Sequence, residues 1–201
     1  MEAVLIIGNN IDLASFDFNN KYVVGIDKGA LYALECGIKL DLALGDFDSI
    51  SEDQFDLIKD RTSIKKLNPI KDDTDTFDAV KMLNNYSKIT ILGGIQGKRI
   101  EHFMANINML KLDSRIEIID NYSHIFIKNE SFILKKDQYK YVSFFAVEDV
   151  FGLDLIGFKY NLSNQILSSI DSFCISNELT SNTGIVNFRK GKLLVIKSMA
   201  D

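Results

Sequence analysis

Short hydrophobic runs recur from the start of the chain to about Asn121, and most of them are rich in β-branched residues and bounded by turn residues. Runs of this kind predict buried strands, whereas apolar residues spaced three or four positions apart predict helices with one buried face. The strands are predicted at residues 3–7, 22–26, 41–44, 63–68, 88–94 and 115–120, and the helices at residues 28–37, 51–60, 72–86 and 99–112. Strands that alternate with helices favour a mostly parallel sheet with helices on its faces.

Two of these helices also show where they begin or which face they bury. Ser51 is suited to be an N-cap, because its hydroxyl can accept a hydrogen bond from a backbone N–H of the first turn, where acidic residues follow it. In the last predicted helix, the apolar face consists of Ile100, Phe103, Ile107 and Leu110. We expect this face to be buried.

The pattern changes after about Asn121, where strand-like runs follow one another without a helical pattern between them. These runs lie at residues 124–129, 131–136, 140–147, 155–162, 173–179, 184–191 and 192–198. Consecutive short strands separated by turn residues favour an antiparallel sandwich or barrel. The sequence therefore predicts an α/β domain over residues 1–121 and a smaller all-β domain over residues 122–201.

The composition is that of a globular protein, with 46% hydrophobic and 25% charged residues among 201. The net charge of −5 argues against a nucleic-acid partner, because phosphate neutralisation requires a basic face. No apolar stretch reaches membrane-spanning length, and the first residues lack the basic segment of a signal peptide, so neither a membrane partner nor secretion is expected. Cys36 and Cys174 match no metal or redox spacing, which suits a reducing, cytoplasmic location.

Charged residues and glycines follow four of the predicted strands, at the edge where a parallel sheet binds its ligands. Asp27 and Lys28 follow the second strand, and Asp46 and Asp48 follow the third. The next two strand ends carry Lys71, Asp72, Asp73 and Asp75, and then Gly93, Gly94, Gly97, Lys98 and Arg99. One acidic loop is usually a solvated turn, but four such loops on one edge predict a binding site.

Carboxylates that converge on one edge repel each other, by about 4 kcal/mol for a pair ~4 Å apart at an effective dielectric constant of roughly 20. Either their pKa values rise or a cation lies among them. Since the acidic loops contain neither Cys nor His, we expect a hard cation, with Mg²⁺ favoured over Ca²⁺ or Mn²⁺. We also expect Phe47 to anchor its loop to the core, so that Asp46 and Asp48 project on either side of it.

The glycine-rich loop after the fifth strand suits phosphate, because backbone N–H groups and the guanidinium of Arg99 bind phosphate oxygens. The loop matches neither a Walker A motif nor a dinucleotide fingerprint. Taken one at a time, the acidic motifs are also compatible with helix capping. His102 is equally compatible with a ligand contact and with a structural hydrogen bond, whereas His124 is expected to be structural.

The ordered set of loops resembles that of the thiamine pyrophosphokinase family. The matching segments are DKGA (27–30), LDLALGDFDS (40–49), KDDTD (71–75), GIQGKRIEHFMAN (94–106) and SNELT (176–180). Each segment is short, but their order is specific and spans nearly the whole chain. The resemblance implies an α/β domain followed by a β-sandwich, and an enzyme that transfers pyrophosphate from ATP to thiamine with Mg²⁺, giving thiamine diphosphate and AMP.

The resemblance also implies roles for individual residues. Catalysis and Mg²⁺ binding are assigned to Asp46, Asp48, Asp72 and Asp75. ATP binding is assigned to Asp27, Gly45, Ser49, Lys71, Thr74, Gly94, Gly97, Arg99, His102 and Asn106, and thiamine binding to Ser176, Asn177 and Glu178. Members of the family are homodimers that hold thiamine between the α/β domain of one subunit and the β domain of the other, so a homodimer with active sites at the subunit interface is expected.

Several points stay open at this level. Lys28, Lys98, Glu101 and Leu40 depart from the family's usual residues, and either Asp48 or Asp75 is a candidate to take the proton of the thiamine hydroxyl. The alternatives are a related pyrophosphokinase that acts on a pterin alcohol, a non-catalytic thiamine or nucleotide sensor, and a structural protein with acidic loops. The SNELT segment favours thiamine, and the acidic set favours an enzyme, because a sensor has little use for so many repelling charges.

Overall fold

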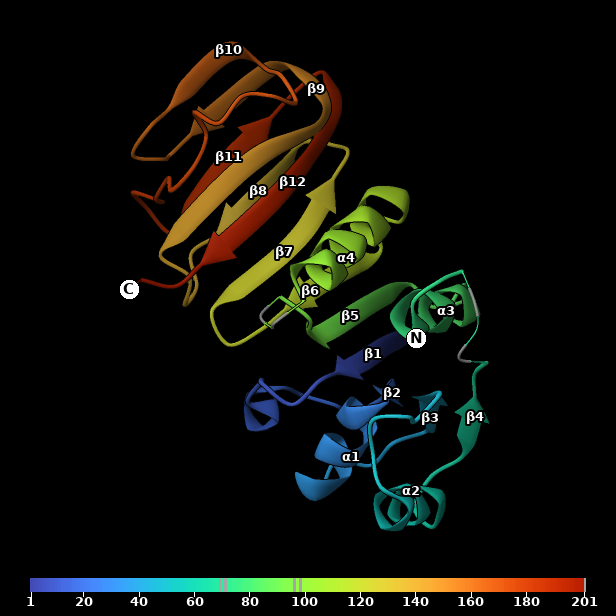
Figure 1. Cartoon of the computed structure of the whole chain (residues 1–201). Coiled ribbons are helices and arrows are strands. Elements are labelled where there is room, and N and C mark those ends of the chain that lie inside the picture. The colour runs from blue at the N-terminus through green and yellow to red at the C-terminus, as the bar shows by residue number, and fades with distance from the viewer. Residues whose placement is uncertain (69, 71, 96, 98, 201) are drawn as a thin grey trace. The chain divides into compact units, whose positions relative to one another are not determined.

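The computed structural model describes residues 1–200 with the exception of residues 69, 71, 96 and 98. Contacts between Cα atoms divide the chain into two compact units. Unit 1 comprises Met1–Met109 and Arg115–Asn121, and unit 2 comprises Leu110–Ser114 and the residues from Tyr122 onward. Figure 1 labels the helices and strands of both units.

Unit 1 contains a parallel sheet with the strand order β4-β3-β2-β1-β5-β6. Its strands are β1 (Glu2–Ile7), β2 (Lys21–Ile26), β3 (Leu42–Gly45), β4 (Ile64–Lys66), β5 (Lys88–Gly93) and β6 (Ile116–Ile119). The chain starts at the centre with β1, moves outward to β4, and then returns to β5 on the other side of β1. The carboxyl ends of β1 and β5 therefore flank the point where the strand order reverses, which is where open parallel sheets bind ligands.

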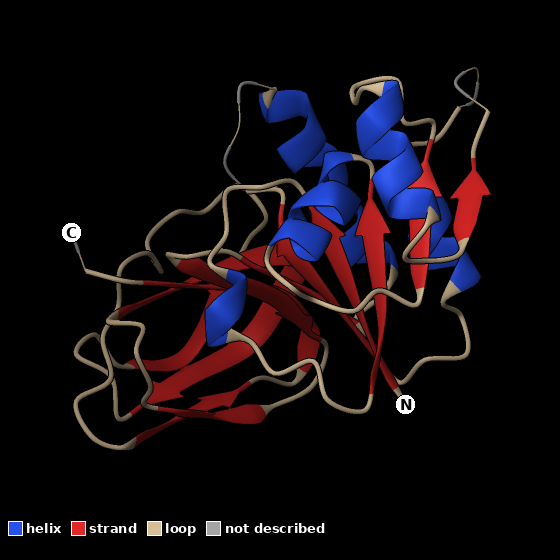
Figure 2. Cartoon of the chain, turned by 90° about the horizontal axis from the view of Figure 1, so that it is seen from below, coloured by secondary structure: helices blue, strands red, loops and turns tan. Residues whose placement is uncertain are grey.

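Helices cover both faces of this sheet (Figure 2). They are α1 (Lys28–Glu35), α2 (Glu52–Lys59), α3 (Asp75–Met82) and α4 (Ile100–Leu112), with a short 3₁₀ turn, η1 (Leu13–Ser15), after β1. Val23 and Ala43 join the core cluster of α1 and α2, whereas their sequence neighbours Val24 and Leu44 line a small cavity with residues of α3. Because successive side chains of a strand point to opposite faces, α3 packs on the face opposite α1.

The helix signals in the sequence are confirmed in part. Ser51 caps α2: its hydroxyl accepts a hydrogen bond from the Gln54 N–H at 3.3 Å, and the Gln54 side chain accepts one from the Ser51 N–H at 3.0 Å. In α4, Leu110 is fully buried, but Ile100 is 67% exposed, because it is the first residue of the helix. The prediction that Ile100 is buried was therefore wrong. No helix in the described ranges is both long and apolar enough to span a membrane.

Unit 2 contains antiparallel strands in two layers. They are β7 (Ser123–Lys128), β8 (Phe132–Lys135), β9 (Tyr141–Ile156), β10 (Leu162–Leu167), β11 (Thr183–Asn187) and β12 (Lys190–Ser198). The first part of the long strand β9 pairs with β12, and its last part pairs with β10 and β11, so β9 belongs to both layers. Phe144 and Val195 of one layer meet Leu134 and Val186 of the other in a shared core. The predicted fold class, a parallel α/β part followed by an antiparallel β-sandwich, is confirmed.

Two strand predictions in unit 2 were wrong in detail, and one strand was missed. Residues 155–162 do not form one strand, because β9 ends at Ile156 and the chain turns before β10 begins at Leu162. The apolar residue that suggested a strand there, Phe158, is 1% exposed and fills the core from the turn. Residues 173–179 form only isolated bridges, at Asn177 and Leu179. The strand β10 was not predicted, because its four central side chains are exposed and three of them are polar.

Candidate active site

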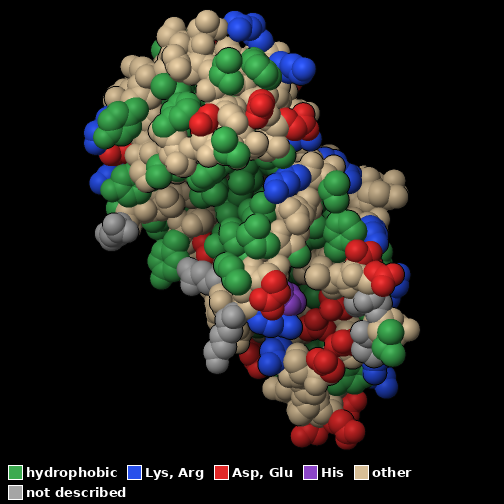
Figure 3. Space-filling model, turned by 45° about the horizontal axis from the view of Figure 1, so that its top comes forward, with side chains coloured by type: hydrophobic (Ala, Val, Ile, Leu, Met, Phe, Trp, Pro, Cys, Tyr) green, Lys and Arg blue, Asp and Glu red, His purple; other side chains and the backbone are tan. Residues whose placement is uncertain are grey.

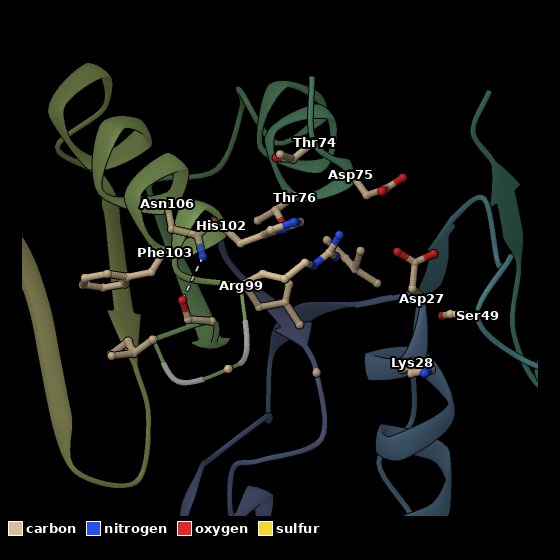
Figure 4. Close-up of a pocket in the computed structure, with 16 residues that line it drawn as sticks. Asp27, Lys28, Ser49, Thr74, Asp75, Thr76, Arg99, His102, Phe103 and Asn106 are labelled. Atoms are coloured by element: carbon tan, nitrogen blue, oxygen red, sulfur yellow. Dashed lines mark hydrogen bonds between the residues drawn. The ribbon is translucent and has the colours of Figure 1, made fainter. Parts of the chain in front are cut away.

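A cavity of about 460 Å³ lies at the carboxyl ends of β1, β2 and β5 in unit 1, which is within the range of roughly 300–1,000 Å³ typical of small-molecule sites. Figure 4 shows Arg99 and His102 pointing into this cavity from the α4 side and Asp27 pointing into it from the opposite side. The lining residues are Ile7, Gly8, Ile26, Asp27, Lys28, Ser49, Thr74, Asp75, Thr76, Gly94, Ile95, Gly97, Arg99, His102, Phe103 and Asn106. The cavity therefore occupies the crevice that the strand order creates.

Asp27, directly after β2, is held in a backbone conformation that residues other than glycine rarely adopt, with φ 47° and ψ −121°. Its Oδ1 accepts a hydrogen bond from the backbone N–H of Phe47 at 3.3 Å. Burial raises the pKa of Asp27 from 3.8 to about 6, and the charges of Asp75, Asp46 and Asp48 act in the same direction. Carboxylates from three loops thus lie close enough to repel one another.

The loop after β3 fits closely around Asp27. A Cβ atom at Gly45 would lie 1.8 Å from Oδ1 of Asp27, and Gly45 has φ 153°, so only glycine fits here. Phe47 is 6% exposed and packs against Phe55 with 5.2 Å between ring centroids. Phe47 therefore anchors the loop to the core, as predicted from the sequence.

The amino terminus of α3 also reaches the cavity. The hydroxyl of Thr74 accepts a hydrogen bond from the Phe77 N–H at 3.2 Å, and Asp75 follows as the first residue of the helix, where a negative charge is favourable. Asp73 instead forms an ion pair with Lys81 on the same helix. The acidic motif is thus divided between the cavity, which Asp75 lines, and the helix surface.

The α4 side of the cavity is fixed by a buried asparagine. Asn106 is 4% exposed, and its Nδ2 donates a hydrogen bond to the carbonyl oxygen of Gly94 at 3.0 Å. Gly94 has φ 77°, and a Cβ atom there would lie 2.5 Å from Ile7 and 2.7 Å from Asn106. His102 and Asn106 are four residues apart and therefore lie on one face of α4. Asn106 thus joins α4 to Gly94, the residue that follows β5.

The structure brings many of the expected site residues together. Of the expected ATP-binding residues, the cavity is lined by Asp27, Ser49, Thr74, Gly94, Gly97, Arg99, His102 and Asn106. Gly45 lies behind Asp27. Of the four expected metal ligands, Asp75 lines the cavity, and Asp46, Asp48 and Asp72 do not. Lys71 and Lys98 lie outside the described residues.

Some lining residues did not emerge from the sequence. Gly8 follows β1 directly, so the rule that was applied to the other strand ends would have found it. Thr76 and Phe103 lie beside expected residues on α3 and α4, but their residue types carry no signal of their own. Lys28, which departs from the family pattern, also lines the cavity. Lys28 and Arg99 thus bring positive charge to a cavity that Asp27 and Asp75 make acidic. Figure 3 shows acidic and basic side chains near a histidine on one face of the molecule.

The residues expected to bind thiamine lie in unit 2. Ser176 is exposed and has φ 53°, whereas Asn177 is 3% exposed. The carboxylate of Glu178 accepts a hydrogen bond from Nζ of Lys159 at 2.9 Å, and this bond lowers the pKa of Glu178. Within the part of the chain that the structure describes, no three His, Cys, Asp or Glu side chains converge as the ligands of a metal ion.

The fold and the cavity together define a class of protein. A parallel sheet with a ligand cavity at the reversal of its strand order, lined by carboxylates, glycines and an arginine, is typical of an enzyme that acts on a phosphorylated ligand. A family model described as thiamin pyrophosphokinase, catalytic domain, matches residues 14–119, and one described as thiamin pyrophosphokinase, vitamin B1 binding domain, matches residues 130–193. The chain belongs to the thiamin pyrophosphokinase family.

Individual relatives agree with this assignment. A thiamine pyrophosphokinase of Bacillus subtilis is 36% identical over 93% of this chain and 92% of its own length. The crystal structure of a thiamine pyrophosphokinase from Bacillus subtilis matches with a TM-score of 0.89 and 33% identity, covering 100% of this chain and 99% of its own. The structure of a thiamin pyrophosphokinase from Geobacillus thermodenitrificans matches with a TM-score of 0.89, 30% identity and the same coverage. These findings support neither the pterin-alcohol alternative nor the sensor.

Proposed function

We propose that this chain transfers the pyrophosphoryl group of ATP to the hydroxyl of thiamine, giving thiamine diphosphate and AMP. The observation that carries the proposal is the cavity at the reversal of the strand order, which Asp27 and Asp75 line together with Arg99 and His102. The match to both thiamin pyrophosphokinase family models supports the same reaction. In this proposal residues 1–121 are the catalytic, ATP-binding domain and residues 122–201 are the thiamine-binding domain.

The ATP side of the reaction is assigned to the α4 wall and the loop before it. Backbone N–H groups near Gly94 and Gly97 and the guanidinium of Arg99 are suited to phosphate oxygens, because both present several donors to one anion. The hydrogen bond from Asn106 holds the carbonyl group of Gly94 in place before ATP binds. Most of the rate would come from positioning and from neutralising charge on the phosphates.

The acidic side of the cavity fits Mg²⁺. The pKa of Asp27 is raised by burial and by the negative charges of Asp75, Asp46 and Asp48. A cation bound among these carboxylates would reduce their mutual repulsion. Carboxylate oxygens are the ligands that Mg²⁺ prefers, and this ion commonly needs only one or two of them. We assign its one or two carboxylate ligands to the set Asp46, Asp48, Asp72 and Asp75. When bound, it would neutralise charge on the phosphates of ATP.

Asp75 is the better candidate to accept the proton of the thiamine hydroxyl. It lines the cavity, whereas Asp48 is exposed outside it. The thiamine side is assigned to the segment from Ser176 to Glu178 in unit 2. We further propose a cytoplasmic homodimer in which unit 1 of one subunit and unit 2 of its partner build each active site.

The test is incubation of the purified protein with ATP, Mg²⁺ and thiamine, followed by chromatographic analysis of AMP and thiamine diphosphate. We expect both products in equal amounts, and we expect Asp75→Asn to reduce their rate of formation at least about 100-fold. Asp78→Asn is the matched control, because Asp78 lies one turn further along α3, 3.7 Å from Lys81. A folded Asp75→Asn variant with near-normal turnover would contradict the assignment of Asp75, and absence of AMP formation by the wild type would contradict the proposed function.

A further inference from the structure

The amide of Asn177 is fully engaged inside unit 2, although the residue belongs to the segment assigned to thiamine. Its Oδ1 accepts hydrogen bonds from the backbone N–H groups of Tyr160 at 3.0 Å and Glu178 at 2.9 Å. Its Nδ2 donates to the carbonyl oxygen of Tyr160 at 2.8 Å. An amide oxygen offers two acceptor sites, so both are used, and at 3% exposure of the residue the second N–H is out of reach of a ligand.

The orientation of this amide follows from its partners. The Tyr160 and Glu178 backbone N–H groups are both donors, so the side-chain atom that faces them has to be the oxygen. The main chain of Asn177 is also paired, since its N–H donates to the Val142 carbonyl at 2.9 Å and its carbonyl accepts from the Val142 N–H at 2.8 Å. One residue thus joins three segments: the start of β9, the turn at residues 157–161, and the segment from Ser176 to Glu178.

The hydrogen bonds of Asn177 fix the positions of its two neighbours in sequence, Ser176 and Glu178. Ser176 is exposed in the left-handed region, φ 53°, which is unfavourable for a residue other than glycine, and its N–H is held by Oγ of Ser143 at 2.9 Å. On the other side, the Lys159 N–H donates to the Glu178 carbonyl at 2.8 Å, and Nζ of Lys159 donates to the Glu178 carboxylate at 2.9 Å. The turn at residues 157–161, which hydrogen-bonds to Asn177, therefore places Lys159 beside Glu178.

We propose that Asn177 is a positioning residue, which holds Ser176 and the Lys159–Glu178 pair in place and makes no contact with thiamine itself. This inference rests on the proposed function and refines it. The buried member of the segment supports the exposed members, and Ser176 and Glu178 are the groups presented to the substrate. Removing the amide leaves two backbone N–H groups and one carbonyl without their partner, so the turn and the segment lose their common anchor.

The experiment compares Asn177→Ala with Asn187→Ala, a matched control at an exposed position of β11. We expect Asn177→Ala to raise the KM for thiamine roughly tenfold while the KM for ATP stays within about twofold, and Asn187→Ala to change neither. A loss of stability alone would not move one KM selectively in protein that circular dichroism shows to be folded. Ser143→Ala is the second variant, because it removes only the partner of the Ser176 N–H, and it should raise the same KM if Asn177→Ala does not fold.

The measurement that separates positioning from direct contact is made without substrate. An NMR titration should show the pKa of the Glu178 carboxyl closer to its ordinary value in Asn177→Ala than in the wild type, because Lys159 is no longer held beside it. A raised KM for thiamine with an unchanged Glu178 pKa would indicate direct contact and overturn the inference, as would an unchanged KM in a folded variant. A wild type that forms no AMP from thiamine would overturn the proposed function instead, and the ligand-free titration would still decide whether Asn177 holds the segment.

Discussion

Asp27 combines three unfavourable features in one residue: a positive φ, burial, and three neighbouring carboxylates. Such strain persists only where the surrounding structure enforces it, and it concentrates at functional sites. Here the enforcing contacts are the N–H of Phe47, which donates to the Asp27 side chain, and the carbonyl of Leu44, which accepts from the Asp27 N–H at 3.0 Å. These contacts hold Asp27 in place although its conformation and charge lower the free energy of unfolding, and this destabilisation can be measured.

Asp27→Asn should stabilise the metal-free protein at neutral pH. The pKa of Asp27 is about 6 in the folded state, against 3.8 unfolded, so the unfolded chain loses this proton first and stability falls as pH rises between these values. Above about pH 7 Asp27 is ionised in the folded protein and the loss of folding stability is complete. Asparagine removes at most about 3 kcal/mol of this loss, and it also tolerates the positive φ. Urea unfolding with EDTA at about pH 4 and pH 8 measures the difference. Equal effects of the substitution at both pH values would contradict the raised pKa.

Gly45→Ala should impair the reaction far more than Gly37→Ala. A Cβ atom at Gly45 collides with the Asp27 carboxylate, whereas a Cβ atom at Gly37 has no neighbour within 4 Å. Both positions have positive φ, 153° and 75°, so both variants carry backbone strain of roughly 1–3 kcal/mol. We expect turnover to fall about 100-fold in Gly45→Ala and to stay within about twofold in Gly37→Ala. Similar turnover in the two variants would mean that the position of Asp27 is not critical.

At the scale of residues, the sequence predicts which side chains lie at the candidate site, but it does not predict the contacts that fix their conformations. Asp27, Asp75 and Arg99 each follow a predicted strand, and this local position was enough to place them at one edge. The positive φ of Asp27 and the internal use of the Asn177 amide depend on contacts with residues distant in sequence, such as Phe47 and Tyr160. Residue type and spacing carry no information about such contacts.

Helix ends position most of the candidate site at the scale of elements. Asp27 precedes α1, Asp75 begins α3, and His102 lies in the first turn of α4. These ends were predictable, because a parallel sheet delivers every helix start to the same edge. The paired layers of unit 2 were less predictable, since Phe158 is a buried apolar residue in a turn, and β10 is an edge strand whose four central side chains are exposed.

Asn106→Ala should loosen the contact between α4 and Gly94. The substitution removes the hydrogen bond to the Gly94 carbonyl and leaves that carbonyl without this donor, at a cost of roughly 1–2 kcal/mol in stability. We expect the KM for ATP to rise about tenfold, with a smaller change in the KM for thiamine. Asn108→Ala, at an exposed position of the same helix, is the control. Steady-state kinetics with each substrate varied in turn measures both KM values. A larger rise in the KM for thiamine than in the KM for ATP would contradict the assignment of α4 to ATP.

Subunit mixing tests the proposed arrangement of active sites at the scale of the whole molecule. Asp75→Asn damages unit 1, and Ser176→Arg places a bulky cation on the exposed segment of unit 2. If each site combines unit 1 of one subunit with unit 2 of its partner, equal mixing of the two inactive variants restores about a quarter of the wild-type activity, because half of the dimers are mixed and each has one intact site. Sites contained within single subunits would leave the mixture inactive, and sedimentation measures the dimer itself.

The strand β12 is the last strand of unit 2 in sequence, yet it lies between β7 and β9. A ribosome releases β7 and β9 before the strand that joins them, whereas all strands of unit 1 are available once Ile119 has been made. Unit 2 therefore completes its pairing only after β12 has emerged, and such long-range pairing is slow. During that interval β7 and β9 expose unpaired backbone edges, which are the surfaces that a chaperone or a neighbouring nascent chain would engage.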